Sequence, residues 1–153
     1  DLYFFSYPKK INKIKFTHYS CFGNWNPYTN YLVAKKKYGL IENTKTNTGT
    51  FSNFAQNDQK LYALHTYCMY LKFGFGRATQ DASIEIRRGA MKRSQGIELA
   101  KLYDNQYPKE YLKDYLSYFK ISKIQFDKIL DRWANKKLFY KKNNKWHPKF
   151  EIK

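Results

Sequence analysis

Hydrophobic residues recur every three or four positions in three segments of the second half of the chain. This spacing predicts short amphipathic helices over residues 93–103, from Pro108 and from Ser122. Ser122 and Gln125 have the spacing of a capping box, which marks the start of the last helix. The apolar residues of the last two helices are Tyr111, Leu112, Tyr115, Leu116, Phe119, Phe126, Ile129, Leu130 and Trp133. Burying a large apolar side chain is worth roughly 1.5–3 kcal/mol, so we expect these faces to form core.

Alternation of apolar and polar residues predicts strands near both ends of the chain. The string KIKFTHYSCF, residues 13–22, places apolar side chains at every second position and predicts a strand. Residues 138–150 predict a β-hairpin that turns at Asn143-Asn144, and Pro148 restricts its second strand to a sheet edge.

Two further helices are expected between these ends. Asn26 and Pro27 have the character of N-cap and first residue of a helix that runs to Tyr38, where Gly39 stops it. Residues 42–54, rich in Asn, Thr and Gly, predict an exposed loop. A long apolar helix capped by Asn57 or Asp58 should then reach about Phe73. We expect its core side to consist of Leu61, Leu64, Cys68 and Leu71.

The stretch KFGFGRATQDASIEIRRG, residues 72–89, is the main candidate for chemistry. Gly74 and Gly76 predict a bend at which the backbone can approach a ligand closely. Thr79 and Gly89 are candidate caps of a short helix, on which Arg77, Asp81 and Glu85 would lie one turn apart on one face. Such a row suits a polar substrate, but composition alone favours the other interpretation, a solvated helix face with ion pairs.

Composition and charge limit the classes of protein to which this chain can belong. The 153 residues fit one typical domain, and the 20% aromatic share argues against disorder. A net charge of +17 favours an anionic partner, although lysines spread along the whole chain are also typical of an AT-rich genome. Cys21 and Cys68 show neither zinc-site nor disulfide-framework spacing. No apolar run is long enough to span a bilayer and no signal peptide is recognisable, so we expect a cytoplasmic protein without membrane contact.

Several strings of the chain resemble one enzyme family. GTFSNFAQNDQKLYALHTYCMYLKFGFGRATQDASIEIRRG, GIELAKLYDNQYPKEYL, FDKILDRW and, upstream, WNPYTNYLVAKKKYGL occur in the order found in N-acetyl sugar amidotransferases of the PseA/WbpG type. The resemblance covers most of the chain. Those enzymes are similar to PP-loop ATP pyrophosphatases. Their SGGKDS-like nucleotide loop belongs to an N-terminal half that these residues do not contain.

The resemblance implies an activity, cofactors and partners. The enzymes of this family make bacterial surface glycans, either lipopolysaccharide O-antigen or flagellin glycans with sugars such as pseudaminic acid, and convert a sugar N-acetyl group into an acetamidino group. ATP with Mg would activate the amide oxygen, and ammonia would replace it. The expected partners are a HisH-like glutaminase, a HisF-like ammonia-channel subunit, and a nucleotide-linked or free N-acetyl sugar. The chain alone is expected to be inactive because the phosphate loop is absent.

Eight residues are candidates for substrate binding, whereas no catalytic or metal-binding residue can be assigned. Lys72, Arg77 and Arg87 would contact substrate or phosphate, and Asp81 and Glu85 would orient them or bind sugar hydroxyls. His65 is more often a core histidine on such a helix, but the resemblance places it in an aromatic HxY-like string. Asp58 and Lys60 match an acidic-Lys string of the family, in which Gln59 replaces an Asp. Asn26 likewise stands where the family has Asp.

Together these patterns predict a mainly α (α+β) fold. An N-terminal strand precedes about six helices and a C-terminal hairpin. Residues 1–48 would end the nucleotide-binding α/β domain of a PP-loop enzyme, and residues 49–153 would form a helical C-terminal domain. The alternative is a basic winged-helix-like nucleic-acid-binding module, since three helices and a lysine-rich hairpin have that outline. Nucleic acid is the less favoured partner, because the lysines of these helices are scattered among acids.

Overall fold

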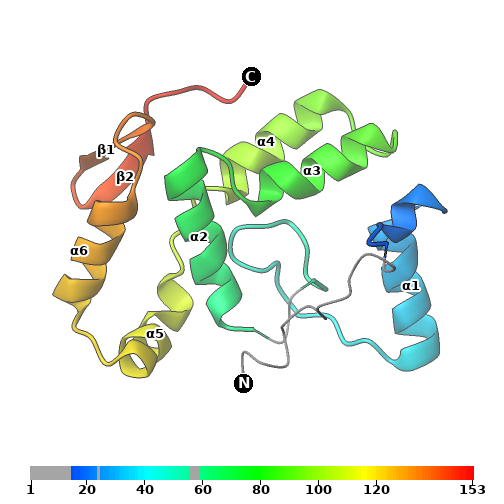
Figure 1. Cartoon of the computed structure of the whole chain (residues 1–153), viewed down its shortest axis with the longest axis horizontal. Coiled ribbons are helices and arrows are strands. Elements are labelled where there is room, and N and C mark those ends of the chain that lie inside the picture. The colour runs from blue at the N-terminus through cyan, green and yellow to red at the C-terminus, as the bar shows by residue number, and fades with distance from the viewer. Residues whose placement is uncertain (1–14, 24, 56–58) are drawn as a thin grey trace. The chain divides into compact units, whose positions relative to one another are not determined.

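The computed structural model describes residues 15–23, 25–55 and 59–153, and its chain divides into two compact units, Asp1–Leu40 and Ile41–Lys153. The described residues form six α-helices, two short 3₁₀ helices and a two-stranded antiparallel sheet (Figure 1). The predicted fold class, mainly helical with a C-terminal hairpin, is confirmed. None of the helices described is long and apolar enough to cross a membrane.

The first unit contains η3 (Tyr19–Cys21) and α1 (Pro27–Tyr38). The predicted caps of α1 are confirmed. The Asn26 side chain accepts hydrogen bonds from the backbone N–H groups of Tyr28 and Thr29, both at 3.1 Å, and Gly39 ends the helix with φ +67°. Asparagine is favoured at the N-cap because its side chain supplies a hydrogen-bond acceptor, and glycine is favoured at the C-cap because it tolerates the left-handed conformation.

The strand predicted over residues 13–22 is wrong for the part described, residues 15–22, where η3 is the only regular element. A strand satisfies its backbone N–H and C=O groups only when a neighbouring strand pairs with it. No other strand occurs among the described residues of this unit. The apolar side chains of the segment consequently lie open, and Tyr19 and Phe22 are 68% and 78% exposed.

The second unit begins with an irregular segment and continues as α2 (Leu61–Phe73), α3 (Arg77–Arg87) and α4 (Arg93–Tyr103). η4 (Lys109–Tyr111), α5 (Leu112–Phe119) and α6 (Lys123–Trp133) follow, and then β1 (Phe139–Lys142) and β2 (Lys145–Pro148). The predicted capping box of Ser122 and Gln125 opens α6. The predicted Asn143-Asn144 turn joins the strands, with both residues at positive φ. The predicted domain boundary after residue 48 falls within the irregular segment.

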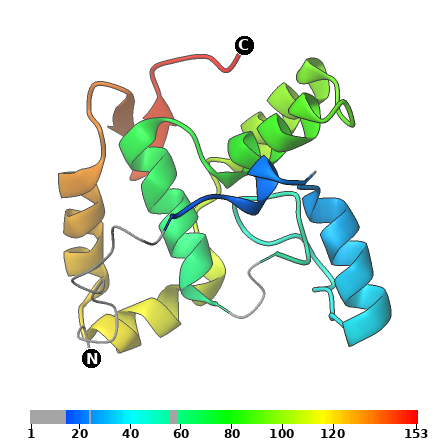
Figure 2. The same cartoon turned by 45° about the vertical axis from the view of Figure 1, so that its right-hand side comes forward.

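The core of this unit lies where α2, α5, α6 and the hairpin meet, as Figures 1 and 2 show. It consists of Tyr67, Tyr70, Leu71, Tyr115, Phe126, Leu130, Ala134, Phe139 and Trp146. The prediction of which face of α2 is buried is therefore partly wrong. Leu71 is buried and Leu64 packs against the core, but Leu61 and Cys68 are exposed. Tyrosines can occupy the inner face of α2 because their aromatic rings contribute apolar area to the core.

The helices α3 and α4 lie side by side (Figure 2). Gly96 of α4 permits this close approach, since a Cβ atom there would lie 2.7 Å from Ile86 Cδ1 and 3.2 Å from Ala82 Cβ. Glycines lie in both connections of α3 to its neighbours: Gly74, at φ +84°, ends α2, and Gly89, at φ +79°, follows α3 as predicted. Gly76 precedes α3 with an extended backbone.

Candidate functional site

A depression with a volume of about 400 Å³ lies between α2 and the beginning of α3. Its lining is mainly polar and aromatic and consists of Gln59, Leu61, Tyr62, His65, Thr66, Met69, Arg77 and Gln80. Arg77 and His65, two of the eight predicted site residues, are thus brought to one surface. The lining residues described include no carboxylate, and Arg77 brings a guanidinium to this surface.

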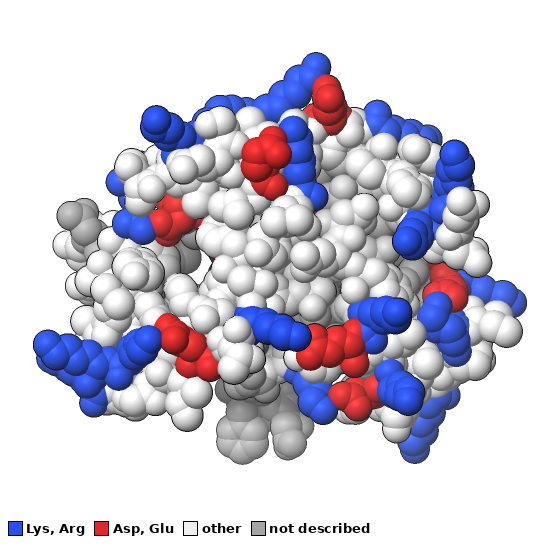
Figure 3. All heavy atoms as spheres, turned by 180° about the vertical axis from the view of Figure 1, so that it is seen from behind, with Lys and Arg blue, Asp and Glu red and all other residues white. Residues whose placement is uncertain are grey.

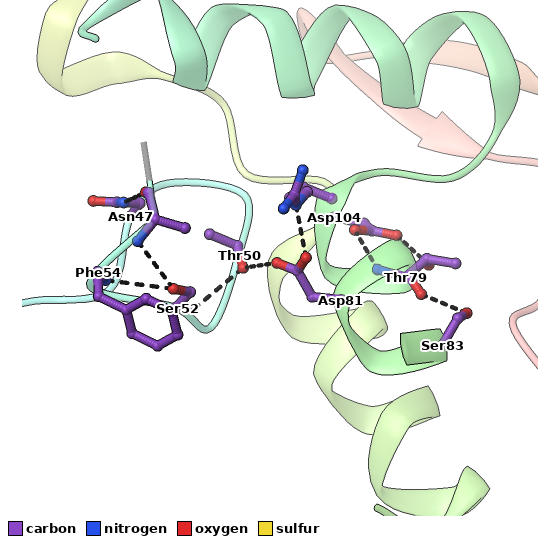
Figure 4. A network of polar contacts seen from close by, with 10 residues as sticks. Asn47, Thr50, Ser52, Phe54, Thr79, Asp81, Ser83 and Asp104 are labelled. Carbon is purple, nitrogen blue, oxygen red and sulfur yellow. Dashed lines mark hydrogen bonds and ion pairs between the residues drawn. The ribbon is translucent and has the colours of Figure 1, made fainter. Parts of the chain in front are cut away.

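Arg77 is held from behind by Asp81. Its Nε donates to Asp81 Oδ1 at 2.7 Å, and Asp81 Oδ2 accepts a hydrogen bond from the Thr50 hydroxyl, also at 2.7 Å (Figure 4). Thr50 is completely buried and the Asp81 side chain is 15% exposed, whereas the Arg77 side chain is 32% exposed. The carboxylate is therefore largely shielded from water, and the guanidinium remains partly open to it. Because only Nε is used by Asp81, the geometry leaves the outer nitrogens of Arg77 for a ligand.

The irregular segment around Thr50 was predicted to be an exposed loop, and this is wrong for its middle part. Thr50 is fully buried and Ser52 is 9% exposed. The segment bonds to α3 through Gly49, whose carbonyl accepts from the Ala78 N–H at 3.1 Å. Gly49 has φ +90°, and a Cβ atom there would lie 2.7 Å from Thr66 Oγ1. The close approach of this segment to α2 therefore requires glycine.

The first turn of α3 is capped by Asp104, which follows α4. The buried carboxylate accepts a hydrogen bond from Gly76 N at 2.9 Å. It also accepts from Thr79 N at 3.2 Å and from the Thr79 hydroxyl at 2.5 Å (Figure 4). Thr79 was predicted to be the N-cap, but the helix begins at Arg77 and Thr79 lies within its first turn. Since Asp104 and Gly49 already use the backbone N–H groups of residues 76, 78 and 79, this helix start has few donors left for a phosphate.

Gly76 is required by this arrangement. A Cβ atom at Gly76 would lie 2.6 Å from Asp104 Oδ1, closer than real contacts allow. The glycine bend predicted to admit a ligand instead admits the carboxylate of Asp104. The glycine bend affects the depression only indirectly. It sets the position at which α3 begins, and Arg77 is the first residue of that helix.

The strings found in the sequence agree with a comparison against known protein families. Residues 48–152 match the C-terminal domain of WbpG-like lipopolysaccharide biosynthesis proteins. The chain belongs to this family. The resemblance noted in the sequence is confirmed at this level, and the chain has a role in lipopolysaccharide or related glycan biosynthesis. No curated protein matches the chain significantly.

The other candidate residues that the structure describes in this WbpG-like domain do not line the depression. Lys60 pairs with Asp114 at 2.8 Å on the surface, and Lys72 Nζ lies 5.2 Å from the centre of the Phe73 ring at the opposite end of α2. Glu85 pairs with Arg88, and Arg87 is exposed in the last turn of α3. Asp58 lies outside the described residues. Within the predicted row, Arg77 and Asp81 form one pair, whereas Glu85 belongs to another.

Several residues that line the depression were not predicted from the sequence, and Tyr62 is the most informative of them. Tyr62 is 9% exposed, and its hydroxyl has no hydrogen-bond partner among the described residues. Burial raises the pKa of Tyr62, nearby Arg77 opposes the rise, and Asp81 adds to it. The tyrosine therefore stays neutral. The signal available was its helical spacing to His65 and Thr66, but the tyrosines of α2 could not be told apart by pattern.

The described residues contain no cluster of three or more His, Cys, Asp or Glu side chains that could hold a metal ion. The described side chains that line the depression offer hydrogen-bonding groups and one charge. The Arg77 guanidinium and the Gln80 amide can donate, and His65 can donate or accept. This set suits an oxygen-rich ligand such as a sugar that carries an acidic or N-acetyl group.

Proposed function

We propose that the WbpG-like domain forms part of the sugar-binding site of an ATP-dependent N-acetyl sugar amidotransferase. The match to the family over residues 48–152 carries the proposal. The depression between α2 and α3 supports it, because Arg77 is held there by a half-buried ion pair with Asp81, which in turn accepts a hydrogen bond from the buried Thr50 hydroxyl.

In this reaction the sugar's amide oxygen is replaced by nitrogen from ammonia, and ATP supplies the activation that makes the oxygen a leaving group. The described residues do not suit the ATP phosphates, since the chain has no SGGKDS-like loop and the donors at the start of α3 are already used. We assign ATP with Mg to the part of such enzymes that carries that loop. Ammonia would come from the HisH-like glutaminase through the HisF-like subunit.

The residues of this chain have binding and positioning roles in the proposal. Arg77 binds an anionic or carbonyl oxygen of the sugar through its outer nitrogens, and Asp81 holds the guanidinium in place. His65 and Gln80 contact sugar hydroxyls. Holding a substrate in one orientation increases the reaction rate, because the loss of translational and rotational entropy occurs on binding instead of in the reaction step.

The test uses the gene product that contains these residues, together with its glutaminase and channel subunits. The product would be followed by mass spectrometry as the exchange of oxygen for an NH group in an N-acetyl sugar supplied with ATP and glutamine. Arg77→Gln should lower kcat/KM by about tenfold or more, because a hydrogen bond to a charged group is worth about 1.5–3 kcal/mol. Arg132→Gln is the matched control, since Arg132 is exposed on α6, away from the depression. Absence of amidinated sugar from the wild-type enzymes would refute the proposal.

The nucleic-acid alternative rests on the net charge of +17 and on the helices followed by a hairpin. On the face drawn in Figure 3, Lys and Arg side chains lie in separate groups, several of them beside Asp or Glu. A duplex-binding surface needs cations along a continuous track. This face does not favour the alternative.

A further inference from the structure

The C-terminal end of α2 carries two exposed aromatic residues for which the proposed sugar-binding site has no use. Phe73 is the last residue of α2, and Phe75 lies just beyond Gly74, the C-cap. The two residues are 53% and 41% exposed, and their rings stack with centroids 6.1 Å apart. Single apolar side chains are common on protein surfaces, whereas adjoining ones with a polar rim mark interaction sites.

The bend at Gly74 holds these rings in place. A Cβ atom at Gly74 would lie 3.1 Å from Leu138 Cδ1 and 3.4 Å from Phe150 Cε1. Leu138 and Phe150 pack against the hydrophobic core of the second unit. The bend that carries Phe73 and Phe75 therefore rests on the edge of the core, and the apolar surface is present before any partner binds.

The segment 135–138 places lysines beside this bend. Asn135 joins the segment to the end of α2, because its N–H donates to the Leu71 carbonyl at 2.9 Å and its Nδ2 donates to the Lys72 carbonyl at 3.3 Å. Lys149 is bonded to the same segment, since its Nζ donates to the Lys136 carbonyl at 2.7 Å. We define the basic aromatic patch as Lys72, Phe73, Phe75, Lys136, Lys137 and Lys149.

The lysines of the patch are not neutralised by the part of the chain that the structure describes. All four are exposed, and none of them forms an ion pair with a described residue. Lys136 and Lys149 donate to backbone carbonyls, and Lys72 Nζ lies 5.2 Å from the centre of the Phe73 ring. The patch therefore presents four positive charges around two apolar rings. Its complement is a surface that is anionic outside and apolar beneath.

A bilayer of anionic phospholipids has this construction. Its headgroups attract lysines that lie near the membrane surface, and aromatic side chains enter the boundary between the headgroups and the acyl chains. Surface binding becomes stable when two such contributions act together. A nucleic acid would instead stack its bases on the aromatic rings. The facing sides of Phe73 and Phe75 are closed to a base, because the two rings stack on each other.

We propose that the basic aromatic patch binds the surface of an anionic phospholipid bilayer. Phe73 and Phe75 enter the headgroup boundary, and the four lysines contact lipid phosphates. The expectation of no membrane contact rested on the lack of a spanning segment and of a signal peptide, and neither feature is needed for binding at the surface. No residue of the patch lines the depression between α2 and α3, so the proposal does not depend on the amidotransferase function.

The test is co-sedimentation of the full chain with vesicles of phosphatidylcholine mixed with phosphatidylglycerol, and with vesicles of phosphatidylcholine alone. We expect binding to the anionic vesicles that weakens as salt is added, and little binding to the neutral ones. The triple variant Lys72→Gln/Lys136→Gln/Lys137→Gln should bind the anionic vesicles about tenfold more weakly or less, since each lysine near an anionic surface contributes about fivefold. Absence of wild-type binding, or equal binding to both kinds of vesicle, would overturn the proposal.

The matched control is Lys109→Gln/Lys128→Gln/Lys145→Gln, which removes the same charge from exposed positions outside the patch. The lysines changed in both triple variants are exposed, so neither variant should disturb the fold. Equal weakening in the two variants would show general attraction to a basic chain and overturn the proposal. Oligonucleotide binding that depends on the patch lysines, without vesicle binding, would assign the patch to nucleic acid and also overturn it.

The contribution of the rings is tested separately with Phe73→Ser/Phe75→Ser. This variant keeps every charge, so it should still bind anionic vesicles, but several times more weakly and with a steeper dependence on salt. Circular dichroism checks that the variant folds. Wild-type binding by the folded variant would show that charge alone holds the chain at the vesicle, and would contradict the entry of the rings.

Discussion

The carboxylate of Asp104 accepts two hydrogen bonds from Thr79, one from its backbone N–H at 3.2 Å and one from its hydroxyl at 2.5 Å. The two residues lie on different helical segments, and their bonds lock the beginning of α3 against the end of α4. Since Arg77 is the first residue of α3, the position of the candidate sugar-binding guanidinium depends on this bond pair.

Removal of the carboxylate should destabilise the fold. In Asp104→Ala, the N–H groups of Gly76 and Thr79 lose their acceptor inside the protein, and we expect a loss of about 2–3 kcal/mol in the free energy of unfolding. Urea denaturation followed by circular dichroism measures it. Asp114→Ala is the control, because its pair with Lys60 is exposed and should change stability by at most about 1 kcal/mol. Equal stability of both variants would show that Asp104 does not hold α3.

The buried hydroxyl of Thr50 should act on the reaction through Arg77. Thr50→Val keeps the shape but removes the donor to Asp81, so the aspartate can shift and the guanidinium with it. We expect kcat/KM for amidination to fall by about tenfold, mainly through KM, while Thr50→Ser restores it. An unchanged KM in the valine variant would disprove this positioning role even if the melting temperature fell.

Two tyrosine hydroxyls should respond differently to removal. The Tyr62 hydroxyl has no partner among the described residues, whereas the Tyr115 hydroxyl donates to the Lys60 carbonyl at 2.6 Å. Tyr115→Phe should therefore cost about 1 kcal/mol of stability, and Tyr62→Phe should cost close to nothing. Urea denaturation of the two variants gives the comparison. A larger loss for Tyr62→Phe would reveal a structural hydrogen bond at the depression.

Stability should decline at alkaline pH. Burial raises the pKa of Tyr70 and of Tyr115 from 10.0 to about 12, so the folded protein retains these phenolic protons when the unfolded chain has lost them. Their contribution is complete below pH 10 and is lost as the pH rises toward 12. The midpoint of urea denaturation, measured across this range, should fall. Tyr70→Phe should make the fall shallower, and an unchanged slope would contradict the burial of this hydroxyl.

Local chemistry made the helix ends and the hairpin predictable from the sequence. Asn26, Pro27 and Gly39 fix α1, Ser122 and Gln125 open α6, and Asn143-Asn144 forms the turn between the strands. In each case the residues that interact are within a few positions of one another, so their spacing alone carries the information. The family strings likewise identified the chain as WbpG-like.

The candidate site was only partly predictable. Helical spacing indicated the pair of Arg77 and Asp81, because i and i+4 side chains meet on any helix. It equally suggested Glu85, which bonds to Arg88 instead. The depression itself, with Tyr62 and Gln80, depends on how α2 and α3 approach each other. The spacing of residues within one helix does not predict how two helices pack.

The sequence by itself determined the helices, the hairpin and the family, since these depend on neighbours along the chain. Tertiary structure decided which residues face one another: Thr50 meets Asp81 from 31 positions away, and Asp104 meets Thr79 from 25. The physical reason is that a buried carboxylate must find donors wherever packing brings them. Those donors come from whichever segment lies beside it in the folded chain.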